Sequence, residues 1–166
     1  MPADIALALQ PANPQQLTDL YGHFPRYDRL RIRSVNASPY GPTLTLRIDL
    51  PEFPAEPPEE WAAAECDTLQ CHFQFQAVEN LALSRWEPPA EARFNAWSVS
   101  RLATEVRVMG TGIALSFQTH PQFLIRHISA CRAAADEPEH HHLSRLDTKL
   151  HGTSEPATTT ETFYAR

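Results

Sequence analysis

The chain has 166 residues, of which 42% are hydrophobic, and a formal net charge of −6. This length fits one ordinary domain with an appendage, and it is sufficient to bury a core without crosslinks. The acidic balance and the lack of a basic patch argue against a nucleic-acid partner. No run of about 18 to 20 apolar residues is present, which argues against a membrane partner.

Cysteine content and the N-terminus bear on the compartment. The three cysteines, Cys66, Cys71 and Cys131, are too few and odd in number for a disulfide framework. The first 16 residues lack the basic start of a secretory signal. We therefore expect a cytoplasmic protein.

The first predicted element is a short helix over residues 13–20. Asn13 is suited to cap its N-terminus, and Pro14 fits the first helical position. Leu17 and Leu20 then lie on one face, as a helix packed against a core requires.

Strand-like segments follow as far as residue 130. Apolar and polar residues alternate, and Pro or Gly turns separate the segments. The predicted strands cover residues 29–33, 43–50, 69–76, 81–85, 94–100, 106–109, 113–117 and 122–130. No long helical pattern lies between them, so parallel crossovers are not expected. Residues 1–133 are predicted to form a single mainly β domain, an antiparallel meander of about eight strands in a sandwich or half-barrel.

The end of the chain has a different composition. Residues 133–166 carry three basic and six acidic residues and few large apolar ones. Such a segment buries too little surface to offset its ordering entropy, so we predict a disordered tail over residues 134–166. His140, His141 and His142 are contiguous and cannot readily converge on one ion, so they suggest incidental metal affinity rather than a built site. We expect neither a metal nor another cofactor.

The most distinctive run is LTLRIDLPEFPAEPPEEW at residues 44–61. Leu44, Leu46, Ile48 and Leu50 fall on one face of a strand, and a proline-rich loop follows. From Asp49 to Asp67 there are seven acidic residues and no Lys or Arg. The run predicts a rigid, acidic projection from the sheet.

Sequence patterns of catalysis are weak. Cys71 and His72 are adjacent on a predicted strand and so point to opposite faces, and Cys71 shares the apolar face. No nucleophile elbow or phosphate-cradling glycine loop occurs. The paired carboxylates lie in a loop expected to be solvated, whereas a catalytic carboxylate needs an apolar pocket. We therefore predict that the protein is not an enzyme.

The acidic loop has two readings, a solvated surface that aids solubility and a docking surface for a basic partner. Tryptophan residues are ambiguous in the same way, because they anchor interfaces and also cover cores. Trp61 and Trp86 are expected to cover the ends of the sheet. The candidate partner-binding residues are Asp49, Glu52, Glu56, Glu59, Glu60 and Trp61.

Residues 13–130 resemble the immunity protein 50 family of bacterial polymorphic toxin systems. The resemblance rests on the Leu20-Tyr21-Gly22 turn, Pro25, a Gly-Pro turn and the L-x-L-R-x-D-L-P strand with its proline-rich loop and tryptophan. The matching positions in this last part are Leu44, Leu46, Arg47, Asp49, Leu50, Pro51, Phe53, Pro54, Pro57, Pro58 and Trp61. Many members have an early Trp that this chain lacks, and a Phe-His-Asp-like aspartate whose counterpart is at best Asp28.

The resemblance implies a cytoplasmic protein that neutralises a cognate toxin domain by binding it. Toxins that attack nucleic acids are often basic, and an acidic inhibitor suits such a partner. One alternative is a small-molecule carrier that uses the mouth of a β-barrel, which requires a closed barrel with an apolar cavity above about 300 Å³. A weaker one is a hydrolase, which requires His72, His120 or His127 to converge with carboxylates.

Overall fold

The computed structural model describes residues 2–133 and 142–143. The helices are α1 (Pro2–Ala8), α2 (Gln15–Tyr21) and α3 (Glu59–Ala63). The long strands are β2 (Arg29–Ser38), β3 (Thr43–Asp49), β4 (Thr68–Phe75), β5 (Glu79–Trp86), β6 (Ala90–Ser100), β7 (Ala103–Gly110), β8 (Ile113–Thr119) and β9 (Gln122–Cys131). Two strands of two residues, β1 (Gln10–Pro11) and β10 (His142–Leu143), complete the set.

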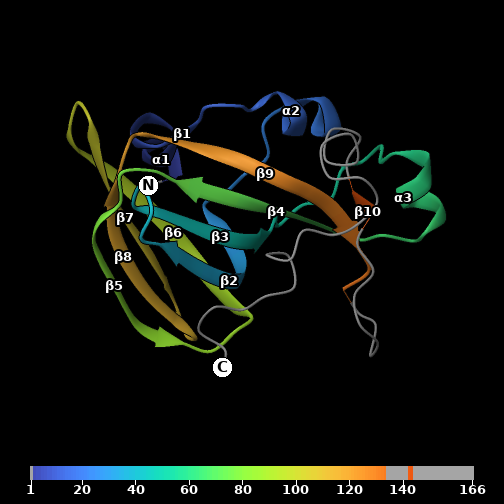
Figure 1. The fold of residues 1–166 in the computed structure, drawn as a ribbon. Coiled ribbons are helices and arrows are strands. Elements are labelled where there is room, and N and C mark those ends of the chain that lie inside the picture. The colour runs from blue at the N-terminus through green and yellow to red at the C-terminus, as the bar shows by residue number, and fades with distance from the viewer. Residues whose placement is uncertain (1, 134–141, 144–166) are drawn as a thin grey trace.

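The strands form one sheet in the order β1-β9-β4-β3-β2-β6-β7-β8-β5, and β10 pairs with β9 (Figure 1). Every pairing between long strands is antiparallel, and β1 runs parallel to β9. The mainly β, antiparallel prediction is therefore confirmed. The order differs from one continuous meander, because β2-β3-β4 and β6-β7-β8 are separate meanders joined through β2 and β6. Only hairpin neighbours leave a local sequence signal, so the β2–β6 and β4–β9 pairings had none.

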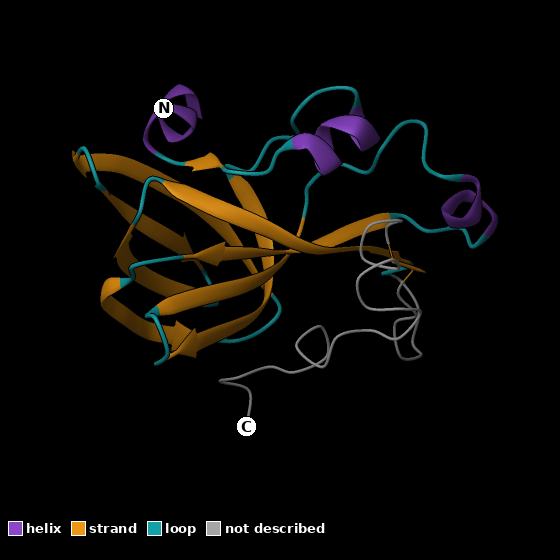
Figure 2. Cartoon of the chain, turned by 45° about the horizontal axis from the view of Figure 1, so that its top comes forward, coloured by secondary structure: helices purple, strands orange, loops and turns teal. Residues whose placement is uncertain are grey.

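The sheet curves strongly, as Figures 1 and 2 both show, and its buried side chains form a hydrophobic core cluster. Its inner face carries the alternating apolar residues of the strands, and aromatic rings meet across the curve. Phe75 on β4 packs against Phe94 on β6 at 6.1 Å and against Phe117 on β8 at 5.0 Å between ring centroids. Phe73 and Phe123 are 4.6 Å apart. These contacts join the two meanders into one hydrophobic cluster, which is the half-barrel alternative of the prediction.

The sheet does not close. Along the path of described strands, β1 lies at one end and β5 at the other, and no pairing joins them. The carrier alternative required a closed barrel, so the structure removes its main premise. β5 is exposed on both faces along most of its length. Two register shifts against β8 interrupt it, and such irregularity discourages pairing with another chain at an exposed edge.

The predicted helix is confirmed as α2, but the predicted cap is wrong. The N-cap position is Pro14, and no side chain caps the helix. The Asn13 side chain instead accepts a hydrogen bond from the Ile125 N–H and donates one to the Ile125 carbonyl, both at 2.8 Å. Asn13 thus joins the N-terminal segment to β9, where it satisfies backbone groups on the strand's edge.

Two further observations concern the remaining segments. Among the described residues, no helix is long and apolar enough to cross a membrane. Of the predicted disordered tail, residues 134–141 and 144–166 lie outside the described residues, and with them His140 and His141. His142 and Leu143 form β10 opposite Ala130 and Ser129.

Gly110 marks a close approach between neighbouring strands. It pairs with Ala92, and a Cβ atom at this position would overlap the carbonyl oxygen of Glu91. Because a backbone atom cannot yield as a flexible side chain does, Gly110→Ala is expected to destabilise the protein by about 1–3 kcal/mol. Urea unfolding measures the loss, with Thr111→Ala at the exposed neighbouring position as control. An unchanged midpoint for Gly110→Ala would contradict this close approach.

Candidate partner-binding surface

The acidic loop, defined here as residues 50–67, joins β3 to β4 and contains α3. Leu50 begins it with an N–H···O hydrogen bond to Leu69 at 3.0 Å, which continues the β3–β4 ladder. Figures 1 and 2 show α3 at the periphery of the molecule, across from strands β5 and β8. The loop is therefore a projection from the sheet, as its prolines predicted.

A buried tryptophan holds the projection together. Trp61 on α3 is 1% exposed, and its ring lies 6.3 Å from that of Phe53. The Pro58 carbonyl accepts hydrogen bonds from the Trp61 and Ala62 N–H groups at 2.9 and 3.0 Å, which forms the first turn of α3. Proline is compatible with this position because its missing N–H is not needed at a helix start.

A second anchor comes from α2. The Tyr21 hydroxyl donates a hydrogen bond to the Glu52 carbonyl at 2.6 Å, across 31 positions of sequence. Burial raises the pKa of Tyr21 well above its ordinary value, and the nearby Cys71 and Glu52 act in the same direction. The phenol is therefore a neutral donor at physiological pH, and it fixes the start of the loop against α2.

Tyr21→Phe removes this hydroxyl and keeps the ring. We expect a loss of about 1 kcal/mol in the free energy of unfolding, because the Glu52 carbonyl loses its donor. Amide hydrogen exchange should rise in residues 50–56 more than in the β6–β8 strands. Tyr40→Phe, at an 89% exposed site, is the control. Unchanged exchange in the loop would show that Tyr21 does not anchor it.

Four of the candidate residues present carboxylates to solvent. Glu52, Glu56, Glu59 and Glu60 are all exposed, and within the described part of the chain none of them has an ion-pair partner. Glu59 and Glu60 lie in the first turn of α3, where negative charge is favourable to a helix. The acidic loop thus carries uncompensated negative charge on an anchored backbone.

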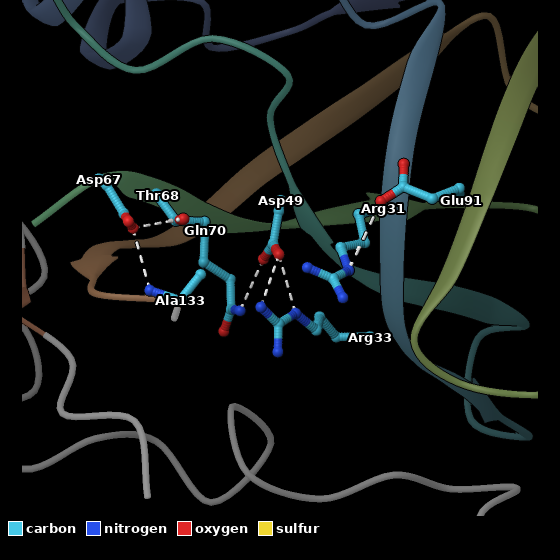
Figure 3. Close-up of polar contacts among 8 residues, drawn as sticks. All are labelled: Arg31, Arg33, Asp49, Asp67, Thr68, Gln70, Glu91 and Ala133. Carbon is cyan, nitrogen blue, oxygen red and sulfur yellow. Dashed lines mark hydrogen bonds and ion pairs between the residues drawn. The ribbon is translucent and has the colours of Figure 1, made fainter. Parts of the chain in front are cut away.

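The far end of the loop is tied to the end of β9. Asp67 accepts hydrogen bonds from the Ala133 N–H and the Thr68 hydroxyl, both at 2.9 Å (Figure 3). The Ala133 N–H is the main reason that the pKa of Asp67 is lowered. Glu65 forms an exposed ion pair with Arg132 at 3.0 Å. These two carboxylates are engaged in holding the loop.

Asp49 lies inside the protein rather than on the acidic surface. Asp49 is 5% exposed. Its Oδ2 accepts a hydrogen bond from Arg33 and its Oδ1 accepts one from Gln70, both at 2.8 Å (Figure 3). The prediction placed it correctly on the polar face of β3. That face is covered at this point, so Asp49 has a structural environment and we do not keep it among the contact residues.

Trp61 needs the same correction. Its side chain packs into the core, as expected for a residue that covers the end of the sheet, and so it presents no surface to a partner. Trp86, the other predicted cover, is half-buried and packs against the core cluster. The candidate contact set is thereby reduced to the four exposed glutamates.

The histidines named for the hydrolase alternative lie in two places. His72 and His127 come together, with ring centroids 4.8 Å apart, because a bulge at His127 (φ 51°) turns its side chain toward β4. Sequence reasoning missed this pair, since the bulge leaves no clear local signal. His120 lies apart and accepts a hydrogen bond from the Gln122 N–H. Among the described residues, no three His, Cys, Asp or Glu side chains are grouped to hold a metal ion.

The curved antiparallel sheet and the anchored acidic loop place the chain in the class of small, mainly β proteins with a charged projecting loop. Within that class its family is defined by sequence. Residues 13–129 match the family described as Immunity protein 50, so the chain belongs to this family, as its motifs predicted. The match includes the whole acidic loop. No curated protein and no solved structure matches the chain.

Proposed function

We propose that this immunity protein binds a cognate toxin domain and neutralises it without catalysis, in the cytoplasm of the cell that makes the toxin. The proposal rests on the family together with one observation, the exposed and uncompensated carboxylates of the acidic loop. A surface of one sign attracts a partner of the opposite sign and accelerates encounter. The partner expected is therefore a toxin domain with a basic face.

The structure supports binding by a preformed surface. Tyr21, Trp61 and Asp67 hold the acidic loop at its start, middle and end. An anchored loop loses little conformational freedom when a partner binds, so more of the interaction energy appears as affinity. Glu52, Glu56, Glu59 and Glu60 are the residues proposed to meet the toxin.

Co-expression tests the proposal directly. The cognate toxin domain is produced in a sensitive bacterium with and without this protein. We expect growth arrest by the toxin alone, rescue by co-expression, and co-purification of the two proteins in a stable complex. Full toxicity in the presence of soluble, folded immunity protein would overturn the proposal.

A further inference from the structure

A pocket of about 480 Å³ lies beside the acidic loop. Its walls come from α1, the segment that leads into β2, the start of the acidic loop and β6. Pro51 and Glu52 belong both to this pocket and to the acidic loop, so the two features adjoin. Its volume is within the usual range for small-ligand sites, about 300–1,000 Å³.

Two arginines on neighbouring strands of the sheet line the pocket. Arg29 on β2 and Arg93 on β6 are direct cross-strand partners. The adjacent pair is hydrogen-bonded through the Phe94 N–H and the Asp28 carbonyl, so the Arg29–Arg93 position is a non-hydrogen-bonded one. Such positions bring the two Cα atoms to about 4.5 Å and the side chains closest together.

Like charges directly opposite each other destabilise a sheet. The next cross-strand pair on the same face has opposite charges, which is favourable. Arg31 lies opposite Glu91, with 3.6 Å between Nε and Oε1. Arg29 and Arg93 have no ion-pair partner within the described residues. The sheet therefore places two arginines directly opposite each other at the wall of a pocket, in a protein whose net charge is −6.

The acidic groups of the pocket offset its positive charge only in part, because three arginines, Arg26, Arg29 and Arg93, line it against two carboxylates, Asp28 and Glu52. Asp28 is bound to Arg26 by hydrogen bonds at 2.9 and 3.2 Å, and the pKa of Asp28 is lowered chiefly by that bond. Glu52 is exposed and forms no ion pair among the described residues. Asn95 also lines the pocket.

We propose that this pocket binds an oxyanion, a carboxylate or a phosphate, held between the guanidinium groups of Arg29 and Arg93. Guanidinium groups bind such anions with paired, charge-assisted hydrogen bonds, and an anion between them replaces repulsion with attraction. The anion has two possible sources, a free small molecule or an acidic side chain of the bound toxin domain. The second source rests on the proposed function.

The first arm of the test uses the full chain alone. Inorganic phosphate and glutarate are titrated separately while the arginine side-chain NMR signals and the melting temperature are followed. For a free ligand, we expect saturable shifts of the Arg29 and Arg93 signals and a rise in melting temperature that follows site occupancy. The variant R29Q/R93Q should bind the anion at least about tenfold more weakly, whereas R101Q, at an exposed position outside the pocket, should bind it normally.

The second arm measures affinity for the cognate toxin domain. If the ligand is an acidic side chain of the toxin domain, we expect no binding of phosphate or glutarate in the first arm. R29Q/R93Q should then bind the toxin domain at least about tenfold more weakly, whereas R101Q should bind it normally. The proposal would be overturned if neither phosphate nor glutarate bound and all variants had the same affinity for the toxin domain. It would also be overturned if R29Q/R93Q and R101Q lost the same amount of affinity. If the unsubstituted protein does not bind the toxin domain, the proposed function is wrong. The first arm then decides by itself whether the pocket binds an oxyanion.

Discussion

Asp49→Ala is expected to destabilise the protein by about 3–5 kcal/mol, because it removes one member of a buried ion pair. The side chains of Asp49 and Arg33 are 6% and 13% exposed, so water cannot readily replace the lost carboxylate. Gln70 also loses the acceptor for its Nε2 group. Losses of this size are comparable with the whole stability of many domains.

Urea unfolding followed by tryptophan fluorescence measures this effect. Asp49→Asn keeps the shape and one acceptor, so its loss should be smaller. A double-mutant cycle with Gln70→Ala should give a coupling of about 0.5–3 kcal/mol between the two side chains. At a temperature where Asp49→Asn remains folded, its affinity for the toxin domain should be unchanged. A small stability loss with a large loss of affinity would restore Asp49 as a contact residue.

The strand content could be predicted because its cause is local. Leu44, Leu46, Ile48 and Leu50 alternate with polar residues, and all four are buried as the period of two requires. The strand order could not be predicted in the same way. It depends on pairs such as Arg29 with Arg93, which are far apart in the sequence and share no turn signal.

The candidate site shows the same division. The exposure of Glu56, Glu59 and Glu60 follows from a proline-rich, charged segment, and sequence reasoning identified it. The burial of Asp49 depends on Arg33 and Gln70, which reach it from two other strands. A signal was present, since opposite charges occur on the polar faces of neighbouring predicted strands, but charge alone does not reveal that the face is covered.

Helix α3 was missed for a different reason. Four prolines between residues 51 and 58 predict a loop, and this signal obscures the helix that follows it. Yet Pro58 followed by Glu59 and Glu60 is a typical helix start, with proline before acidic residues in the first turn. Recognising that start would have placed Trp61 on a helix one face of which must pack against the core.

Charge reversal of the acidic loop is expected to slow toxin binding more than any other surface change. For E56K/E60K, we expect the association rate at low salt to fall roughly tenfold to a hundredfold, because two lysines beside the two remaining glutamates cancel the charge that steers the basic partner. The rate should also lose most of its dependence on salt, since exposed charges are screened beyond about 10 Å at 0.1 M ionic strength. Stopped-flow or surface-based kinetics at several salt concentrations measure both effects.

E79K/E87K is the matched control for this change. Glu79 and Glu87 are exposed, have no ion-pair partner among the described residues, and lie at the two ends of β5, across the molecule from α3. The two variants change the net charge equally, so a difference between them reports the position of the charge. If both slow association to the same extent, overall charge rather than the acidic loop steers the partner. If E56K/E60K alone does so, the contact surface lies at α3, because local charge acts strongly only within about a Debye length.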